Sequence, residues 1–238
     1  HAEKPLGWPW GECRRMVQEC ARRGVQLTVG HQQRLSDTAR QTREWVEAGA
    51  IGSLERVEIS RVNLFDAAAH QLDLGNWFAG DRPAEWVLGN VDYRERNLHK
   101  GVHQEQGAVA LWKYPGGVFG FITVGTGDAL LPEQSIVLRG SEGTIERAHG
   151  SHARLRRFGE APETVAATDR DDSKRAVEHA VDCLRSGERS PLDAEHALNA
   201  MELTYGIRES ARRRGRVEFP LTVEDDPLEA MVESGALL

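Results

Sequence analysis

The sequence predicts an α+β protein built on an open-faced, mostly antiparallel or mixed β-sheet with helices on one face. Three observations lead to this fold class. Helix and strand patterns alternate over the first 80 residues, sequential strands follow between residues 85 and 158, and two strong helices come after residue 169. Sequential strands favour an antiparallel meander with one face that is solvated or covered by a partner. The early alternation indicates the tail of an α/β domain.

The elements before residue 80 have clear start and stop signals. Gly24 ends the first helix, and either Ser36 or Asp37 can cap the second. Apolar spacing predicts a helix over residues 11–23, a strand over 25–29, a helix over 36–48, a strand over 54–61 and a helix over 66–78.

Beyond residue 80 the pattern changes to alternating strands. Pro115-Gly116-Gly117 and Gly140-Ser141-Glu142-Gly143 are tight-turn signals between strands. The expected strands are 85–93, 108–114, 118–124, 135–139, 144–148 and 154–158, and the expected helices are 171–184 and 193–213. Tryptophans 77, 86 and 112 are expected to pack in the core or on the sheet.

Composition argues against several classes of function. The 238 residues have a formal net charge of −7, which gives a nucleic-acid-binding role little electrostatic support. Cys13, Cys20 and Cys183 form no C-x-x-C pair, which favours a reducing compartment. No run approaches the roughly 18 apolar residues of a membrane span, and no signal peptide is evident. We therefore expect a cytoplasmic protein with no nucleic-acid or membrane partner.

A group of polar residues lies on the expected helix 66–78. Asp66, His70 and Asp73 are spaced at i, i+4 and i+7, so they share one stripe of a helix with about 3.6 residues per turn. An imidazole flanked by carboxylates can accept a proton near neutral pH. A competing interpretation makes Asp66 the cap or a first-turn acid of the helix and gives His70 only a local hydrogen bond.

Six motifs occur in one order along the chain. They are Glu3-Lys4-Pro5, Val29-Gly30-His31-Gln32-Gln33-Arg34-Leu35, Gly49-Ala50-Ile51-Gly52, the Asp66…His70…Asp73 helix, Leu138-Arg139-Gly140-Ser141-Glu142-Gly143-Thr144-Ile145, and Ser210-Ala211-Arg212 followed by Val217-Glu218. This order resembles the glucose–fructose oxidoreductase / inositol dehydrogenase / rhizopine-catabolism (Gfo/Idh/MocA) family of nicotinamide-dependent oxidoreductases. The resemblance covers nearly the whole chain.

The resemblance implies a two-domain enzyme. Family members have an N-terminal Rossmann domain that binds NAD or NADP, and a C-terminal domain with an open-faced mixed sheet. The bare sheet face forms a homodimer or homotetramer contact, and the active site lies between the domains. The implied reaction is hydride transfer between the nicotinamide and a hydroxyl or carbonyl carbon of a small molecule, namely a sugar, polyol or related compound.

The resemblance also assigns roles to individual residues. Lys4, Asp66 and His70 become the catalytic group, because a neutral imidazole can take the O–H proton of an alcohol and an ammonium group stabilises the developing alkoxide. Whether Lys4 or His70 is the base stays open, and the Lys4–Pro5 bond is expected to be cis. The cofactor-binding residues are Glu3, Lys4, Pro5 and Arg34; the substrate-binding residues are His31 and Asp73; no metal ligand is expected.

One part of the family pattern is missing. The sequence has no G-x-G-x-x-G loop to hold a pyrophosphate. We therefore expect residues 1–30 to be the C-terminal remnant of a Rossmann domain, and residues 31–238 to be the C-terminal substrate and oligomerisation domain. Such a fragment should bind the dinucleotide poorly and be inactive alone. The link between residues 61 and 66 is shorter than usual, so the substrate stays open, as does the choice of NAD or NADP.

Two other classes of function remain open at this point. The first is a non-catalytic sheet domain that dimerises or binds a partner. The second is metal-assisted hydrolysis or isomerisation with His70, Asp66 and His103, with His99 as a further candidate ligand, since histidine and carboxylate suit zinc or iron. Cofactor binding and metal analysis separate these classes from the oxidoreductase.

Overall fold

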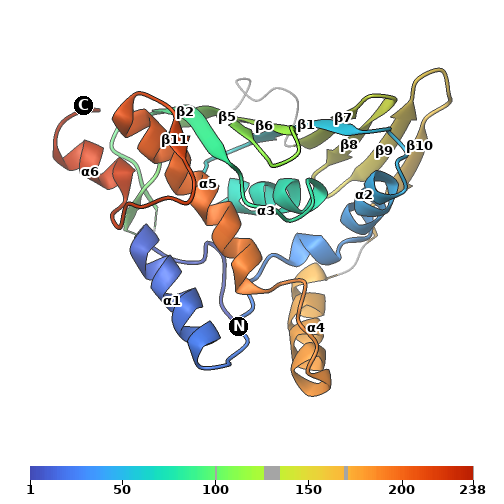
Figure 1. Cartoon of the computed structure of the whole chain (residues 1–238), viewed down its shortest axis with the longest axis horizontal. Helices are drawn as coiled ribbons and strands as arrows, with labels where there is room; N and C mark the ends of the chain where they lie inside the picture. The colour runs from blue at the N-terminus through green and yellow to red at the C-terminus, as the bar shows by residue number, and fades with distance from the viewer. Residues whose placement is uncertain (100, 126–134, 169–170, 238) are drawn as a thin grey trace.

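The computed structural model describes residues 1–99, 101–125, 135–168 and 171–237 (Figure 1). The helical elements are α1 (Trp10–Arg22), η1 (Gln32–Leu35, a 3₁₀ helix), α2 (Asp37–Glu47), α3 (Ala68–Phe78), α4 (Asp172–Ser186), α5 (Ala194–Arg213) and α6 (Pro227–Glu233). The strands are β1 (Leu54–Arg61), β2 (Trp86–Asp92), β3 (Leu98–His99), β4 (Val102–His103), β5 (Gly107–Lys113), β6 (Phe119–Val124), β7 (Ser135–Gly140), β8 (Gly143–Ala148), β9 (His152–Arg157), β10 (Glu163–Ala166) and β11 (Val217–Glu218).

Nine of these strands form one mixed sheet in the order β10-β9-β8-β7-β1-β6-β5-β2-β11. The central strand β1 runs parallel to β6 and antiparallel to β7, and the remaining neighbours pair antiparallel. Helices α2, α3 and α5 lie on one side of the sheet, as Figure 1 shows. The predicted fold class is therefore confirmed. Within the described residues, no helix is long and apolar enough to cross a membrane.

Helix α3 begins later than the sequence predicts. Asn63, which has a φ of 30°, turns the chain, and its Oδ1 accepts hydrogen bonds from the N–H groups of Asp66 (3.0 Å) and Ala67 (2.7 Å). Asn63 therefore caps the turn that leads into α3, and the interpretation of Asp66 as the cap or a first-turn acid of the helix was wrong. Asp66 lies in the turn before the helix, so it does not share a helical stripe with His70 and Asp73.

Other differences concern short elements. Residues 25–29 form no continuous strand, because Thr28 and Val29 each make a single bridge, to Asp193 and Ala2 respectively. The hairpin β3–β4 and the edge strands β10 and β11 have too few residues to show alternation in the sequence. Helix α6 was not expected, although Asp226 caps it and Pro227 occupies its first turn.

The core lies between the sheet and the helices. Gly75 allows α3 to approach β1 closely, because a Cβ atom there would lie 3.1 Å from Ile59 and 3.3 Å from Val57. Trp112 is fully buried and covers Gly120 on the neighbouring strand β6. The packing role predicted for Trp112 is thus confirmed.

The first 30 residues pack onto α5 and the segment before α6. The Trp10 ring lies 5.7 Å from the Tyr205 ring, and the Tyr205 hydroxyl donates to the carbonyl of Gly7 at 3.3 Å. Trp10 Nε1 donates to the carbonyl of Leu221 at 3.4 Å. This segment shares a hydrophobic core with the sheet helices, and a domain boundary near residue 30 stays a prediction.

Arg208 on α5 is the centre of a buried ion-pair network. Its guanidinium lies 2.9 Å from Glu105 and 2.7 Å from Asp226, and all three side chains are fully buried. Glu105 also accepts from the backbone N–H of Leu64 (2.9 Å), and Asp226 accepts from Trp8 Nε1 (3.0 Å). One cation, directly or through its two carboxylate partners, therefore joins α5 to four other segments, those of Trp8, Leu64, Glu105 and Asp226.

Replacing Arg208 with Met should strongly destabilise the protein. The change leaves two buried carboxylates without their cation, which costs about 3–5 kcal/mol of unfolding free energy. Urea unfolding measures the loss. The exposed Arg216, which pairs with Glu218, provides the matched control, and Arg216→Met should change stability by less than about 1 kcal/mol. Equal effects of the two variants would contradict this assignment.

Candidate active site

Lys4 and Asp66, 62 positions apart in the chain, form an ion pair. Lys4 Nζ donates to Asp66 Oδ1 at 2.7 Å and to the Asp66 carbonyl at 3.2 Å. The Lys4–Pro5 peptide bond is cis, as expected. The two side chains are 20% and 26% exposed, so the ion pair is partly open to solvent. The structure thus brings together two of the three residues that were assigned to catalysis.

His70 lies in the first turn of α3, four residues after Asp66, and its ring packs edge-on against His31 with centroids 5.4 Å apart. Both rings are buried, and among the described residues neither Nδ1 atom has a hydrogen-bond partner. Burial, followed by the nearby His31, Lys4 and Arg61, lowers the pKa of His70 to about 2. His70 is therefore a neutral imidazole at neutral pH, and its low pKa makes it a weak proton acceptor in the absence of substrate.

Arg34 and Asp73 form a buried ion pair with each other and are not open to solvent. Arg34 Nε and Nη2 donate to the two oxygens of Asp73 at 2.7 and 2.9 Å, and Nη2 also contacts Asp81 at 2.8 Å. Both side chains of the Arg34–Asp73 pair are 1% exposed. This bidentate pair fixes η1 against α3 and so orients the helix that carries His70. The predicted contacts of Arg34 with the cofactor and of Asp73 with the substrate stay predictions.

The remaining residues of the predicted cofactor group lie next to Lys4. Glu3 is exposed, and its carboxylate lies against Gly30, where a Cβ atom would be 3.2 Å from Glu3 Oε2. Pro5 is partly buried. The segment that contains both is held to the chain near His31, because Ala2 bonds with Thr28 and Gly30 at 2.9 Å.

Two arginines near this site were missed by the sequence analysis. Arg61 is the last residue of β1, and Arg147 lies near the end of β8; they are 9% and 3% exposed. The signal for Arg147 was the alternation of β8, since it falls on the same inward face as the buried Ile145. A charged residue at an inward strand position indicates a specific role.

The structure does not assemble the metal site that was considered. Among the described residues, no three His, Cys, Asp or Glu side chains are placed to hold one ion. His103 instead forms a hydrogen bond with Tyr93, and His99 is exposed on β3.

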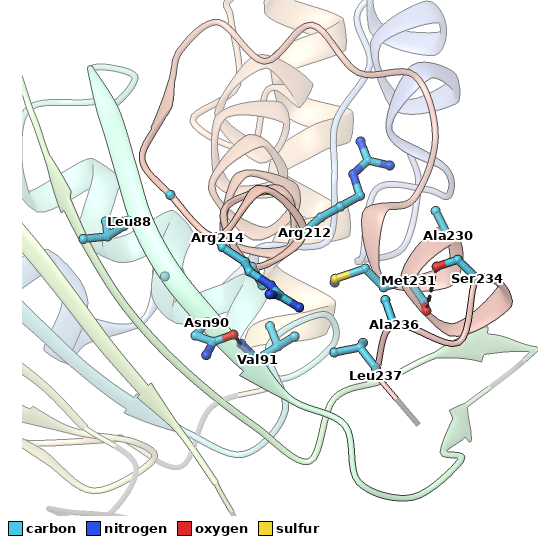
Figure 2. Close-up of a pocket in the computed structure, with 13 residues that line it drawn as sticks. Leu88, Asn90, Val91, Arg212, Arg214, Ala230, Met231, Ser234, Ala236 and Leu237 are labelled. Atoms are coloured by element: carbon cyan, nitrogen blue, oxygen red, sulfur yellow. Dashed lines mark hydrogen bonds between the residues drawn. The ribbon is translucent and has the colours of Figure 1, made fainter.

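A separate cavity of about 630 Å³ lies between β2, the end of α5 and α6. Figure 2 shows the Arg214 side chain entering it beside Asn90 and Val91, with Met231 and Leu237 on the other side. None of the predicted site residues lines this cavity.

Comparison with known proteins identifies the class first. Residues 58–219 match the sequence model of the oxidoreductase family, C-terminal alpha/beta domain. The chain therefore belongs to the Gfo/Idh/MocA oxidoreductase family, which confirms the resemblance seen in the motifs. No curated protein matches it significantly.

Solved structures share the fold. The WlbA dehydrogenase from Bordetella pertussis, in complex with NADH and UDP-GlcNAcA, has 24% identity and a TM-score of 0.72 over 92% of this chain and 72% of its own. An oxidoreductase from Agrobacterium radiobacter, in complex with NAD+, L-tartaric acid and magnesium, has 18% identity and a TM-score of 0.72 over 91% and 71%. An NAD binding oxidoreductase from Klebsiella pneumoniae has 17% identity and a TM-score of 0.77 over 92% and 73%.

The neutral state of His70 makes stability depend on pH. Unfolding restores its ordinary pKa of 6.5 from about 2, so below pH 6.5 the unfolded chain binds the extra proton and stability falls as the pH falls. Between pH 6 and pH 4, His70→Gln should flatten the dependence of unfolding free energy on pH by up to about 1.4 kcal/mol per pH unit. Urea unfolding across this range measures the slope. An unchanged slope would mean that the folded protein already protonates His70.

Proposed function

We propose that this protein takes part in hydride transfer between NAD or NADP and a hydroxyl or carbonyl carbon of a sugar, polyol or related small molecule. The observation that carries the proposal is the partly exposed Lys4–Asp66 ion pair next to the neutral, buried His70. Family membership supports an oxidoreductase. Structural neighbours that were solved with NAD+ or NADH support the choice of cofactor.

The residues have distinct parts in this reaction. His70 accepts the hydroxyl proton as the alcohol is oxidised, or returns it in reduction. The Lys4 ammonium, oriented by Asp66, stabilises the negative charge that develops on the oxygen. The nicotinamide, when bound, takes or supplies the hydride. Within these 238 residues, the partly exposed segment Glu3–Pro5 fits the nicotinamide end of the cofactor, and the sequence contains no glycine-rich loop for the pyrophosphate.

Substitution of the central residues tests this function. In protein that turns over with NAD or NADP, Lys4→Ala and His70→Ala should each lower kcat by about a hundredfold or more, because each removes a group that acts in the transition state. Dinucleotide affinity, measured by fluorescence titration, should change by less than about threefold, since that affinity comes largely from phosphate and adenosine contacts.

Lys174 on α4 provides the control, because it is 71% exposed and pairs only with Glu178. Lys174→Ala should leave kcat and cofactor affinity unchanged. Wild-type turnover in either Lys4→Ala or His70→Ala would exclude the role assigned to that residue. Protein that binds NAD or NADP but turns over no sugar, polyol or related compound would favour the non-catalytic sheet domain instead.

We also propose that the uncovered sheet face joins copies of the chain into a homodimer or homotetramer. Leu88, Val109 and Phe119 on β2, β5 and β6 are 48%, 48% and 37% exposed. Strand pairing places Leu88 opposite Leu111, and Leu111 opposite Phe121, so apolar side chains extend across three strands. An exposed apolar patch of this kind is typical of an interaction surface.

The three cysteines are free, which supports a cytoplasmic location.

A double substitution tests the interface. Leu88→Glu with Val109→Glu should convert the oligomer to monomers, because burying carboxylates without partners is costly. Sedimentation equilibrium measures the mass. Val177→Glu on α4, where the valine is 51% exposed, is the control and should keep the wild-type mass. A monomeric wild-type protein, or an oligomeric double variant, would contradict the proposal.

A further inference from the structure

Arg147 differs from two other buried arginines, Arg34 and Arg208. Each of those is held by two carboxylates, with ion-pair distances of 2.7 to 2.9 Å. Arg147 is 3% exposed, yet in the described part of the chain no carboxylate lies within ion-pair distance of it. A buried charge without a counter-charge is costly, so natural proteins rarely keep one unless it has a use.

The hydrogen bonds of Arg147 are long and go to neutral groups. Nη1 donates to Gln33 Oε1 at 3.4 Å and Nη2 donates to Ser36 Oγ at 3.3 Å, whereas N–H···O bonds are usually near 2.9 Å. Arg147 Nε is buried and has no partner among the described residues. The guanidinium therefore has at least one N–H donor, at Nε, that no acceptor among the described residues uses.

This guanidinium borders a cavity of about 190 Å³, which is lined by Gln33, Ser36, Asp37, Thr38, Arg147, His149, Gly150, Ala167, Thr168 and Asp172. The two acids on its wall already have a cation, because Arg175 lies 3.3 Å from Asp172 and 3.8 Å from Asp37. Arg175 is thus shared by two carboxylates, and Asp172 also attracts the Arg147 guanidinium, although from beyond ion-pair distance.

A chain of side-chain hydrogen bonds through Gln33 links the wall of the cavity to helix α3. Gln33 Oε1, which accepts from Arg147, also accepts from Gln71 Nε2 at 3.4 Å, and Gln71 follows His70 on α3. Antiparallel pairing of β7 with β8 and of β7 with β1 places the C-terminal end of β8 at the same end of the strands as Arg61. An anion beside Arg147 therefore lies at the end of the sheet where β1 leads into α3.

We propose that the substrate carries an acidic group, a carboxylate or a phosphate, and that Arg147 binds this group in the cavity while the reacting carbon lies at His70 and Lys4. The inference rests on the proposed function and adds the chemical class of its substrate. An acidic group supplies the directly contacting anion that the guanidinium lacks, and Nε together with the two Nη atoms provides the donors.

The binding experiment uses the purified 238-residue chain and three probes of similar size. Isothermal titration should show binding of gluconate, glucose 6-phosphate or both, and at least tenfold weaker binding of sorbitol, the neutral counterpart. The ratio of the two acids distinguishes carboxylate from phosphate. Arg147→Met should weaken the acids at least tenfold and leave sorbitol unchanged. Arg185→Met, at an α4 position that is 78% exposed, should leave all three unchanged.

Thermal unfolding separates a binding role from a structural one. If Arg147 is retained for an anion, Arg147→Met should unfold at the same or a higher temperature than the wild type, because it removes a buried charge that has no contacting ion-pair partner. A lower midpoint, failure of the variant to fold, equal binding of sorbitol and gluconate, or no binding of either acid would each overturn the proposal.

The proposed function can fail independently of this inference. His70→Ala should keep acid binding while turnover is lost, because binding and proton transfer use different residues. In protein that binds NAD or NADP, acid binding without any turnover would refute the oxidoreductase reaction alone. Equal turnover of neutral and acidic substrates would refute the acidic substrate alone.

Discussion

The mutual position of Lys4 and Asp66 depends on one buried cation, Arg208. Through Glu105 it fixes the backbone of Leu64, two residues before Asp66. Through Asp226 it fixes the indole of Trp8, four residues after Lys4. Both partners of the exposed ion pair are therefore anchored to the same guanidinium. In a low-dielectric interior such a network is rigid when every polar atom is satisfied. The buried Arg208 network is therefore the rigid support of the partly exposed Lys4–Asp66 pair.

The buried arginines 34, 208 and 147 differ in the charge of their hydrogen-bond partners. Arg34 and Arg208 are saturated by carboxylates and hold elements together, whereas Arg147 bonds only to neutral oxygens. Burial, and then the nearby His31, Lys4 and Arg61, lower the pKa of His70. In the proposed scheme, an acidic substrate offsets part of this positive charge and makes the imidazole a stronger base once the substrate is bound. Substrate selection and activation of the base would then have a single electrostatic origin.

The fold class, the family and most elements followed from the sequence because their signals are local. Alternation in β1 and the Pro115-Gly116-Gly117 turn needs only neighbouring residues to be recognised. The placement of Asp66 was missed because it depends on Asn63, whose side chain replaces the expected cap. Pairing of Arg34 with Asp73 and the isolation of Arg147 were beyond prediction, because both depend on contacts between segments dozens of residues apart. The predicted roles of Lys4 and His70 came from the family motifs, and their juxtaposition is a tertiary property.

The central strand of the sheet, β1, precedes both of its neighbouring strands by many residues in the sequence. β1 ends at residue 61, while β6 begins at residue 119 and β7 at residue 135. A chain emerging from the ribosome therefore carries β1 with two unpaired edges until β6 and β7 have been synthesised. Such edges can pair with another chain, and non-local pairing slows folding. The nascent chain thus has a long interval in which aggregation competes with completion of the sheet.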